Sequence, residues 1–158
     1  MKSAAISHIL IIFTAGALAS VPVAGIVPLA KVYGHQDGSG LGKTKSMAGT
    51  QHEIVMLLIK KGDFEKAAEE ADKIFAMKWP ADQEPLLLSE LLLLSNQFVR
   101  HKQPALSLRL IGRNSKCFKQ TPSRIAILKE MGYVHKSMGE DEKAYDYFRQ
   151  ARELEDKD

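Results

Sequence analysis

The side chains that could carry catalysis are few and scattered. The chain has five histidines: His8, His35, His52, His101 and His135. No two of them stand at the three- or four-residue spacing that brings two metal ligands onto one face of a helix. The single cysteine, Cys117, cannot form an internal disulfide, and no histidine lies beside it in sequence. Carboxylate pairs such as Glu69 and Glu70 fall on outer helix faces, where solvation accounts for them. We therefore expect no catalytic centre, no metal site and no cofactor.

A glycine-rich segment partly matches the motif of a phosphate-binding loop. It reads Gly-Ser-Gly-Leu-Gly-Lys-Thr over residues 38–44, and glycine amides together with a lysine can hold phosphates. The motif requires glycine five residues before Gly42, but Asp37 stands there, and its carboxylate would repel a phosphate. The chain also lacks the alternating strands and helices of a nucleotide-binding sheet. We interpret residues 20–47 as a flexible Gly-rich linker.

The N-terminal stretch has the character of an export signal. Lys2 precedes a segment, residues 3–30, without Asp, Glu, Lys or Arg. A small-x-small site at residues 17–19 predicts cleavage before Ser20, which makes residues 1–19 a signal peptide. The alternative is an uncleaved anchor through residues 9–30, long enough to span a bilayer although Pro22 and Pro28 weaken its helix. Both interpretations export the remaining chain, as a periplasmic or a membrane-anchored protein.

The rest of the chain predicts helices that come in pairs. The segments Gly-Asp-Phe-Glu-Lys-Ala at 62–67 and Gly-Glu-Asp-Glu-Lys-Ala at 139–144 share one design, in which glycine ends a helix and an acidic residue starts the next. Small residues recur at intervals of about 38 residues in Ala67, Ala105 and Ala144. The periodicity predicts an all-α fold with helices over 52–60, 64–77, 84–99, 104–113, 124–137 and 141–155.

The paired helices resemble the tetratricopeptide repeat (TPR) family. In residues 125–158, Leu128, Gly132 and Gly139 stand at the family's positions, followed by Ala144 and Phe148. Residues 48–81 match less completely, and residues 82–124 keep little beyond the apolar pattern and Ala105. The resemblance implies an array of about three helical hairpins over residues 48–158. The positions expected to pack the array are Gly62, Ala67, Ala71, Ala105, Leu128, Gly132, Gly139, Ala144, Phe148 and Ala151. An irregular helical bundle without repeats is the alternative.

Resemblance to this family also implies a groove on the first helix of each hairpin that binds a polypeptide. The positions that correspond to the groove are His52, Met56, Ile59, Glu90, Leu94, Gln97, Lys129, Tyr133 and Lys136. Tyr133 stands where some members use an asparagine to bind a terminal carboxylate, so an amphipathic segment with acidic edges fits better. The alternative is that Met56 and Ile59 belong to the core.

Charge is unevenly distributed along the chain. No acidic residue occurs between Leu91 and Lys129. This stretch holds a basic belt, consisting of Arg100, Lys102, Arg109, Arg113, Lys116, Lys119 and Arg124. Such a belt could attract an acidic protein segment or an anionic membrane surface. Alternatively, these cations keep the protein soluble or pair with the acidic flanking units. The absence of interleaved aromatic residues argues against nucleic acid.

These expectations leave three functional classes for the protein. The leading hypothesis is a non-catalytic adaptor or scaffold of the cell envelope that binds another protein. The alternative is an accessory subunit that stabilises an envelope enzyme or secretion complex by end-to-end stacking. Self-association is also expected, because Leu128, Met131 and Phe148 have no later helix to cover them. An enzyme that uses Cys117 or a histidine forms a third class.

Overall fold

The computed structural model describes residues 40–157, which contain six α-helices, two short 3₁₀ helices and no strand. The α-helices are α2 (Gly40–Lys61), α3 (Phe64–Phe75), α4 (Glu84–Arg100), α5 (Pro104–Asn114), α6 (Thr121–Ser137) and α7 (Asp141–Glu155). The 3₁₀ helices η1 (Ala81–Gln83) and η2 (Ser115–Cys117) precede α4 and follow α5. The predicted all-α class is confirmed. The predicted signal peptide and anchor lie outside the described residues.

Helix α2 begins earlier than the sequence predicts. Its first eight residues, 40–47, belong to the segment that we expected to be a flexible linker, so that boundary is wrong. Glycine disfavours an isolated helix by about 1 kcal/mol per residue, but packing overrides this preference here. Ala48 and Gly49 are buried, and the hydroxyls of Thr44 and Thr50 donate to carbonyls four residues earlier in the same helix.

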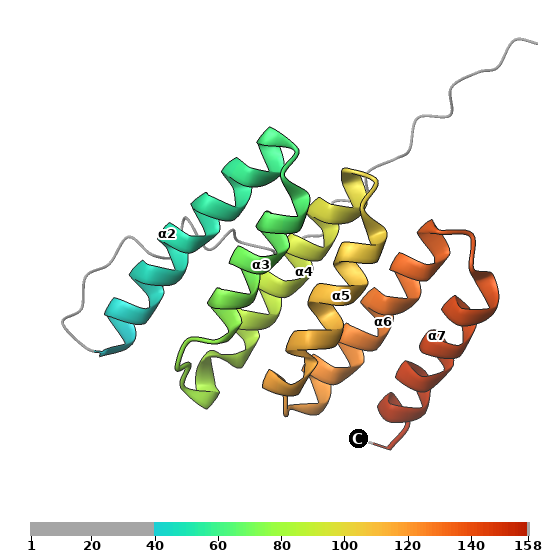
Figure 1. Ribbon diagram of the computed structural model, residues 1–158. Helices are drawn as coiled ribbons and strands as arrows, with labels where there is room; N and C mark the ends of the chain where they lie inside the picture. The colour runs from blue at the N-terminus through green and yellow to red at the C-terminus, as the bar shows by residue number, and fades with distance from the viewer. Residues whose placement is uncertain (1–39, 158) are drawn as a thin grey trace, which may run out of the picture.

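The six helices lie side by side in chain order and alternate in direction (Figure 1). Consecutive helices pack as the pairs α2–α3, α4–α5 and α6–α7. Successive pairs are joined because α3 packs on α5, α4 packs on α6 and α5 packs on α6. The turns within the pairs all lie at one end of the helices. The α3–α4 and α5–α6 connections and the start of α2 lie at the other end (Figure 1).

The turns within the three pairs have the same geometry. Each contains one residue in the left-handed region, namely Gly62 (φ 81°), Lys102 (φ 59°) and Gly139 (φ 75°). In every case this residue donates its N–H to the carbonyl three residues earlier, and the next residue donates to the carbonyl five residues earlier, at 2.8–3.0 Å. This is the Schellman arrangement that ends a helix. Lys102 therefore takes the place that glycine holds in the other two turns.

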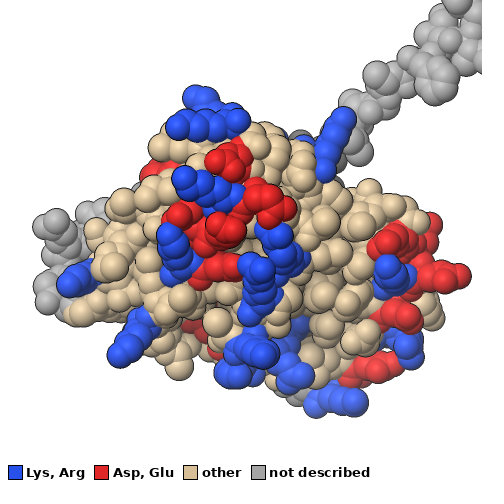
Figure 2. Space-filling view, viewed as in Figure 1, with Lys and Arg blue, Asp and Glu red and all other residues tan. Residues whose placement is uncertain are grey.

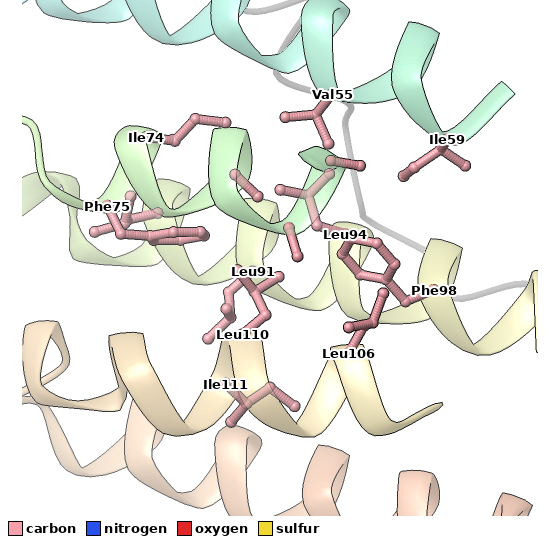
Figure 3. Close-up of a cluster of buried hydrophobic side chains, with 14 of the residues drawn as sticks. Val55, Ile59, Ile74, Phe75, Leu91, Leu94, Phe98, Leu106, Leu110 and Ile111 are labelled. Carbon is pink, nitrogen blue, oxygen red and sulfur yellow. The ribbon is translucent and has the colours of Figure 1, made fainter. Parts of the chain in front are cut away.

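The core runs through the first four helices and continues into α6 (Figure 3). It is built from large apolar side chains that α2, α3, α4 and α5 direct toward one another, including Val55, Ile59, Ile74, Phe75, Leu91, Leu94, Phe98, Leu106, Leu110 and Ile111. Ile127 and Val134 of α6 extend the same cluster. The succession of leucines in α4 is explained by this position, because neighbours surround the helix.

Small residues lie where the helices of a pair meet, and one of them differs from the prediction. Ala67, Ala71, Ala144 and Ala151 are buried, as expected of packing positions. Ala105 is exposed, so its predicted packing role is wrong. The fourth residue of α5, Ser107, takes that role: it is fully buried, and its hydroxyl lies 2.7 Å from that of Ser95 on α4.

In the last pair, Gly132 is buried with its Cα next to the ring of Phe148. Leu128, Met131 and Phe148, which were expected to leave an apolar surface, are each half-buried. The outer side of α7 is mainly charged. On this side, Arg149 pairs with Asp146 and Glu153 along the helix.

Candidate functional site

The residues predicted to line a groove divide into buried and accessible sets. His52, Ile59, Glu90 and Leu94 are buried, so their side chains offer almost no surface to a partner and these predictions are wrong. Met56, Gln97 and Lys129 are half-buried, and Tyr133 and Lys136 are exposed. The burial has a physical cause, since α4 packs on α5 and α6 while its N-terminal half contacts α2 through Glu90.

Aligning the three similar turns places α4 in a different register from the one that the sequence predicted. Met56 of α2, Asn96 of α4 and Tyr133 of α6 are equivalent in this alignment. Each stands six residues before the left-handed residue of its turn, which is Gly62, Lys102 or Gly139. The sequence-based register was displaced by two residues, because the middle turn has no glycine to mark it. The start of α5 could have revealed the shift, since Pro104 occupies the first helical position that Phe64 and Asp141 hold in α3 and α7.

With this register, α2, α4 and α6 present a matching row of side chains. We call it the first-helix face, and it comprises Met56, Leu92, Asn96, Val99, Lys129, Tyr133 and Lys136. Asn96, Tyr133 and Lys136 are exposed, and the other four are half-buried. The ring of Tyr133, 59% exposed, packs edge-on against Phe148 at 5.1 Å between centroids. Lys129 donates to Glu155 of α7 at 2.5 Å. The face thus combines apolar stems, an amide, a phenol and cations.

A buried ion pair joins the first two hairpins beneath this face. His52 Nδ1 of α2 lies 2.6 Å from Glu90 Oε1 of α4. Glu90 is 1% exposed, and its Oε2 has no hydrogen-bond partner. Burial acts to lower the pKa of His52, but the hydrogen bond and charge of Glu90, with a contribution from Glu53, outweigh it and raise that pKa above its ordinary value of 6.5. The pair therefore favours protonated His52 and fixes α2 against α4.

Polar contacts also join the second hairpin to the third. Ser95 of α4 donates its hydroxyl to Glu130 Oε1 of α6 at 2.5 Å, and Ser107 lies within hydrogen-bond distance of Ser95. Burial raises the pKa of Glu130, and the Ser95 hydrogen bond only partly offsets this. Glu84, at the start of α4, accepts the backbone N–H groups of Lys119 and Gln120 at 2.9–3.1 Å. These contacts fix α6 beside α4 and so align their exposed side chains.

The basic belt separates into paired and unpaired cations. Arg109 Nη2 donates to Glu65, and Arg113 Nη1 lies 2.9 Å from Asp72 Oδ2, so α5 is bound to α3 by two ion pairs. Asn114 adds a hydrogen bond to Asp72 at 2.7 Å. Figure 2 shows the molecule from the same side as Figure 1. Acidic and basic side chains are intermixed over its middle, and basic side chains gather below them. The remaining belt residues, Arg100, Lys102, Lys116, Lys119 and Arg124, are exposed and form no ion pair within residues 40–157.

The histidines of the described region contact a carboxylate or an aromatic ring rather than Cys117. No cluster of three or more His, Cys, Asp or Glu side chains that could hold a metal ion occurs there. Cys117 is exposed in η2, with its Sγ 3.8 Å from the carbonyl oxygen of Phe75. His135 lies 2.6 Å from Glu140 and stacks on Tyr147 at the end of α6. None of these groups forms a nucleophile–base pair with another.

Comparisons with known proteins identify no similar protein. Neither the family models, nor the curated proteins, nor the solved structures give a match. Among the helices of residues 40–157, none is long and apolar enough to cross a membrane.

Proposed function

We propose that this chain is a non-catalytic protein-interaction scaffold of the cell envelope, built as a TPR-like array of three helical hairpins. Its partner is a polypeptide segment that binds across the first-helix face. The observation that carries this proposal is the recurrence of one turn geometry at Gly62, Lys102 and Gly139. Equivalent turns put equivalent positions of α2, α4 and α6, the first helices of three successive hairpins, on the same side, which is the arrangement that repeat proteins use to bind extended ligands.

The chemistry of the first-helix face suggests the kind of segment. Met56, Leu92 and Val99 offer half-buried apolar surface, and Asn96 offers an amide with both a donor and an acceptor. Lys136 is exposed beside Tyr133 on α6, where a carboxylate could reach it. An amphipathic segment with acidic edges satisfies these groups best, as the sequence had suggested.

Site-specific photocrosslinking in the native cell tests this proposal. A photoreactive residue at Asn96 or Tyr133 should capture the same partner, whereas one at Arg149, on the charged outer side of α7, should not. Tyr133→Asp introduced together with the Asn96 crosslinker should reduce capture by at least about tenfold, because it places a carboxylate on a site suited to acidic edges. Equal capture from Arg149, or capture unaffected by Tyr133→Asp, would contradict the proposal.

One observation favours the alternative of an accessory subunit that stacks on a larger complex. Met47, Ile54 and Leu57 form an exposed apolar row on α2, and Leu57 is 57% exposed. A row of this kind at the first helix of an array is a suitable surface for end-to-end contact. Leu57→Lys should then release the chain from its complex, whereas binding at the first-helix face should tolerate it. Export, by a cleaved signal or by an anchor, is part of both proposals.

A further inference from the structure

Four exposed cations gather at one end of the helices. Lys78 lies in the α3–α4 connection, Lys116 and Lys119 lie in the α5–α6 connection, and Arg124 lies in the first turn of α6. We call this set the basic end. None of the four forms an ion pair within residues 40–157. They differ in this from Arg109 and Arg113, whose charges are matched by acids of α3.

Helix stabilisation does not explain the position of Arg124, although Lys116 stands in the last turn of η2. Cations stabilise the last turn of a helix and destabilise the first turn, where the backbone dipole is positive. At the opposite end of the molecule, Lys60, Lys61, Arg100 and Lys136 occupy last turns and so have that explanation. Arg124 stands in the first turn of α6, which contains no acidic residue. Its position raises the positive potential of this end instead of compensating a dipole.

Two acids, Asp82 and Glu84, lie beside the four cations of the basic end, so the cations outnumber them. Glu84 is buried, and both its oxygens accept the amides of Lys119 and Gln120. Asp82 is exposed and accepts a hydrogen bond from Gln83. The first turn of α2 also contains no acid, and Lys43 and Lys45 follow at the same end of the molecule (Figure 1). A surface on which exposed cations outnumber the carboxylates attracts anions over several ångströms.

The chain order connects this end to an apolar sequence. Residues 3–30 contain no Asp, Glu, Lys or Arg, and only residues 31–39 separate them from Gly40, where α2 starts. The apolar stretch is therefore joined to the folded helices at the basic end and not at the end that carries the Gly62, Lys102 and Gly139 turns (Figure 1). Apolar sequence followed by basic surface is the combination that holds proteins on anionic bilayers.

We propose that the basic end docks on the anionic headgroups of a phospholipid membrane. In the form of the chain that keeps residues 3–30 as an anchor, the apolar sequence favours a membrane over an acidic polypeptide, because a polypeptide would gain nothing from the position of these residues. The inference goes beyond the proposed function, since the first-helix face is separate from the basic end and stays free for a protein partner. Each cation near an anionic bilayer strengthens binding by about fivefold.

Vesicle sedimentation of the full chain tests this surface. The probes are vesicles of phosphatidylcholine alone and vesicles of equimolar phosphatidylcholine and phosphatidylglycerol. The test variant carries Lys78→Gln, Lys116→Gln, Lys119→Gln and Arg124→Gln. The matched control carries Lys60→Gln, Lys61→Gln, Lys66→Gln and Arg100→Gln, which removes the same charge from exposed cations at the opposite end. Circular dichroism should show that both variants keep the helix content of the original chain.

We expect the original chain and the control to bind the phosphatidylglycerol vesicles at least about twentyfold more tightly than the test variant does. Binding to phosphatidylcholine alone, which reports the apolar sequence, should be equal for all three. Equal losses in the two variants, or no preference of the original chain for phosphatidylglycerol, would overturn the proposal. The proposal would also be overturned if the four substitutions abolished binding of a polyglutamate peptide but left binding to the vesicles unchanged. Crosslinking at Tyr133 is unaffected by these outcomes, so the two proposals can fail separately.

Discussion

Gly132 of α6 and Phe148 of α7 are packed so closely that a β-carbon at position 132 would lie 2.7 Å from Cε1 of the Phe148 ring. Two further ring atoms would lie 2.9 Å away. The last hairpin therefore requires a residue without a side chain at this point. To make room, the ring of Phe148 would have to leave its edge-on packing with Tyr133.

Gly132→Ala should lower the free energy of unfolding by about 1–3 kcal/mol, because the added methyl overpacks the interface between α6 and α7. Chemical denaturation followed by circular dichroism measures this. Gly112→Ala is the matched control, since an added β-carbon there meets no atom within 4 Å. The control should raise the stability by about 0.5–1 kcal/mol, as alanine does at an exposed helix position. Similar effects of the two substitutions would contradict the close packing of Gly132.

Lys102→Gly should stabilise the protein by about 0.5–1 kcal/mol. Lys102 is held at φ 59°, a conformation that glycine adopts without the steric cost of a β-carbon. The reverse change in the equivalent turn, Gly139→Lys, should destabilise by a similar amount, because Gly139 has φ 75°. Thermal unfolding of the two single variants would show opposite shifts of Tm. A loss of stability in Lys102→Gly would mean that the Lys102 side chain stabilises the turn in another way.

Stability should fall as the pH rises through the folded-state pKa of His52. Burial lowers this pKa, but the hydrogen bond and charge of Glu90 outweigh burial, and the pKa is raised above 6.5. A raised pKa means that the contribution is fully present below the unfolded value and is lost above the folded one. Urea unfolding from about pH 6 to about pH 9 measures the slope. Glu90→Gln removes the carboxylate and should flatten this slope; an unchanged slope would exclude the His52–Glu90 pair as its source.

Glu84→Gln should destabilise the protein by about 1–3 kcal/mol, because an amide replaces a carboxylate that accepts two backbone N–H groups. Burial acts to raise the pKa of Glu84, but the hydrogen bonds from Lys119 and Gln120, with Ser123 and the Lys119 charge, lower it overall. The carboxylate therefore stabilises the fold above the unfolded pKa, and the contribution is lost as the pH falls through the folded pKa.

The measurement for Glu84 is urea unfolding between about pH 5 and about pH 2, where the original chain should lose stability more steeply than Glu84→Gln. Asp82→Asn is a suitable control, since Asp82 is exposed and bonded only to its neighbour Gln83. It should change the stability by less than about 0.5 kcal/mol. An equal effect of the two substitutions would show that Glu84 does not fix the start of α6 through the Lys119 and Gln120 amides.

The sequence by itself determined the elements that depend on local chemistry. Glycine at 62 and 139 ended helices and proline at 104 started one, because backbone conformation at these positions is decided by the residue that occupies them. The 3.6-residue apolar pattern then predicted all six helices, five of them with close boundaries.

Tertiary structure decided what depends on contacts between distant residues. The glycine-rich start of α2 is helical and leads directly into the buried Ala48 and Gly49, which local preference does not predict. His52 and Glu90, 38 positions apart, were both expected at a surface and instead pair in the interior. The register of α4 was missed because Lys102 adopts a conformation that its residue type disfavours, held by the hydrogen bonds and packing of its hairpin. Which side of a helix is accessible is set by the neighbours it meets, and those neighbours are brought there by the whole chain.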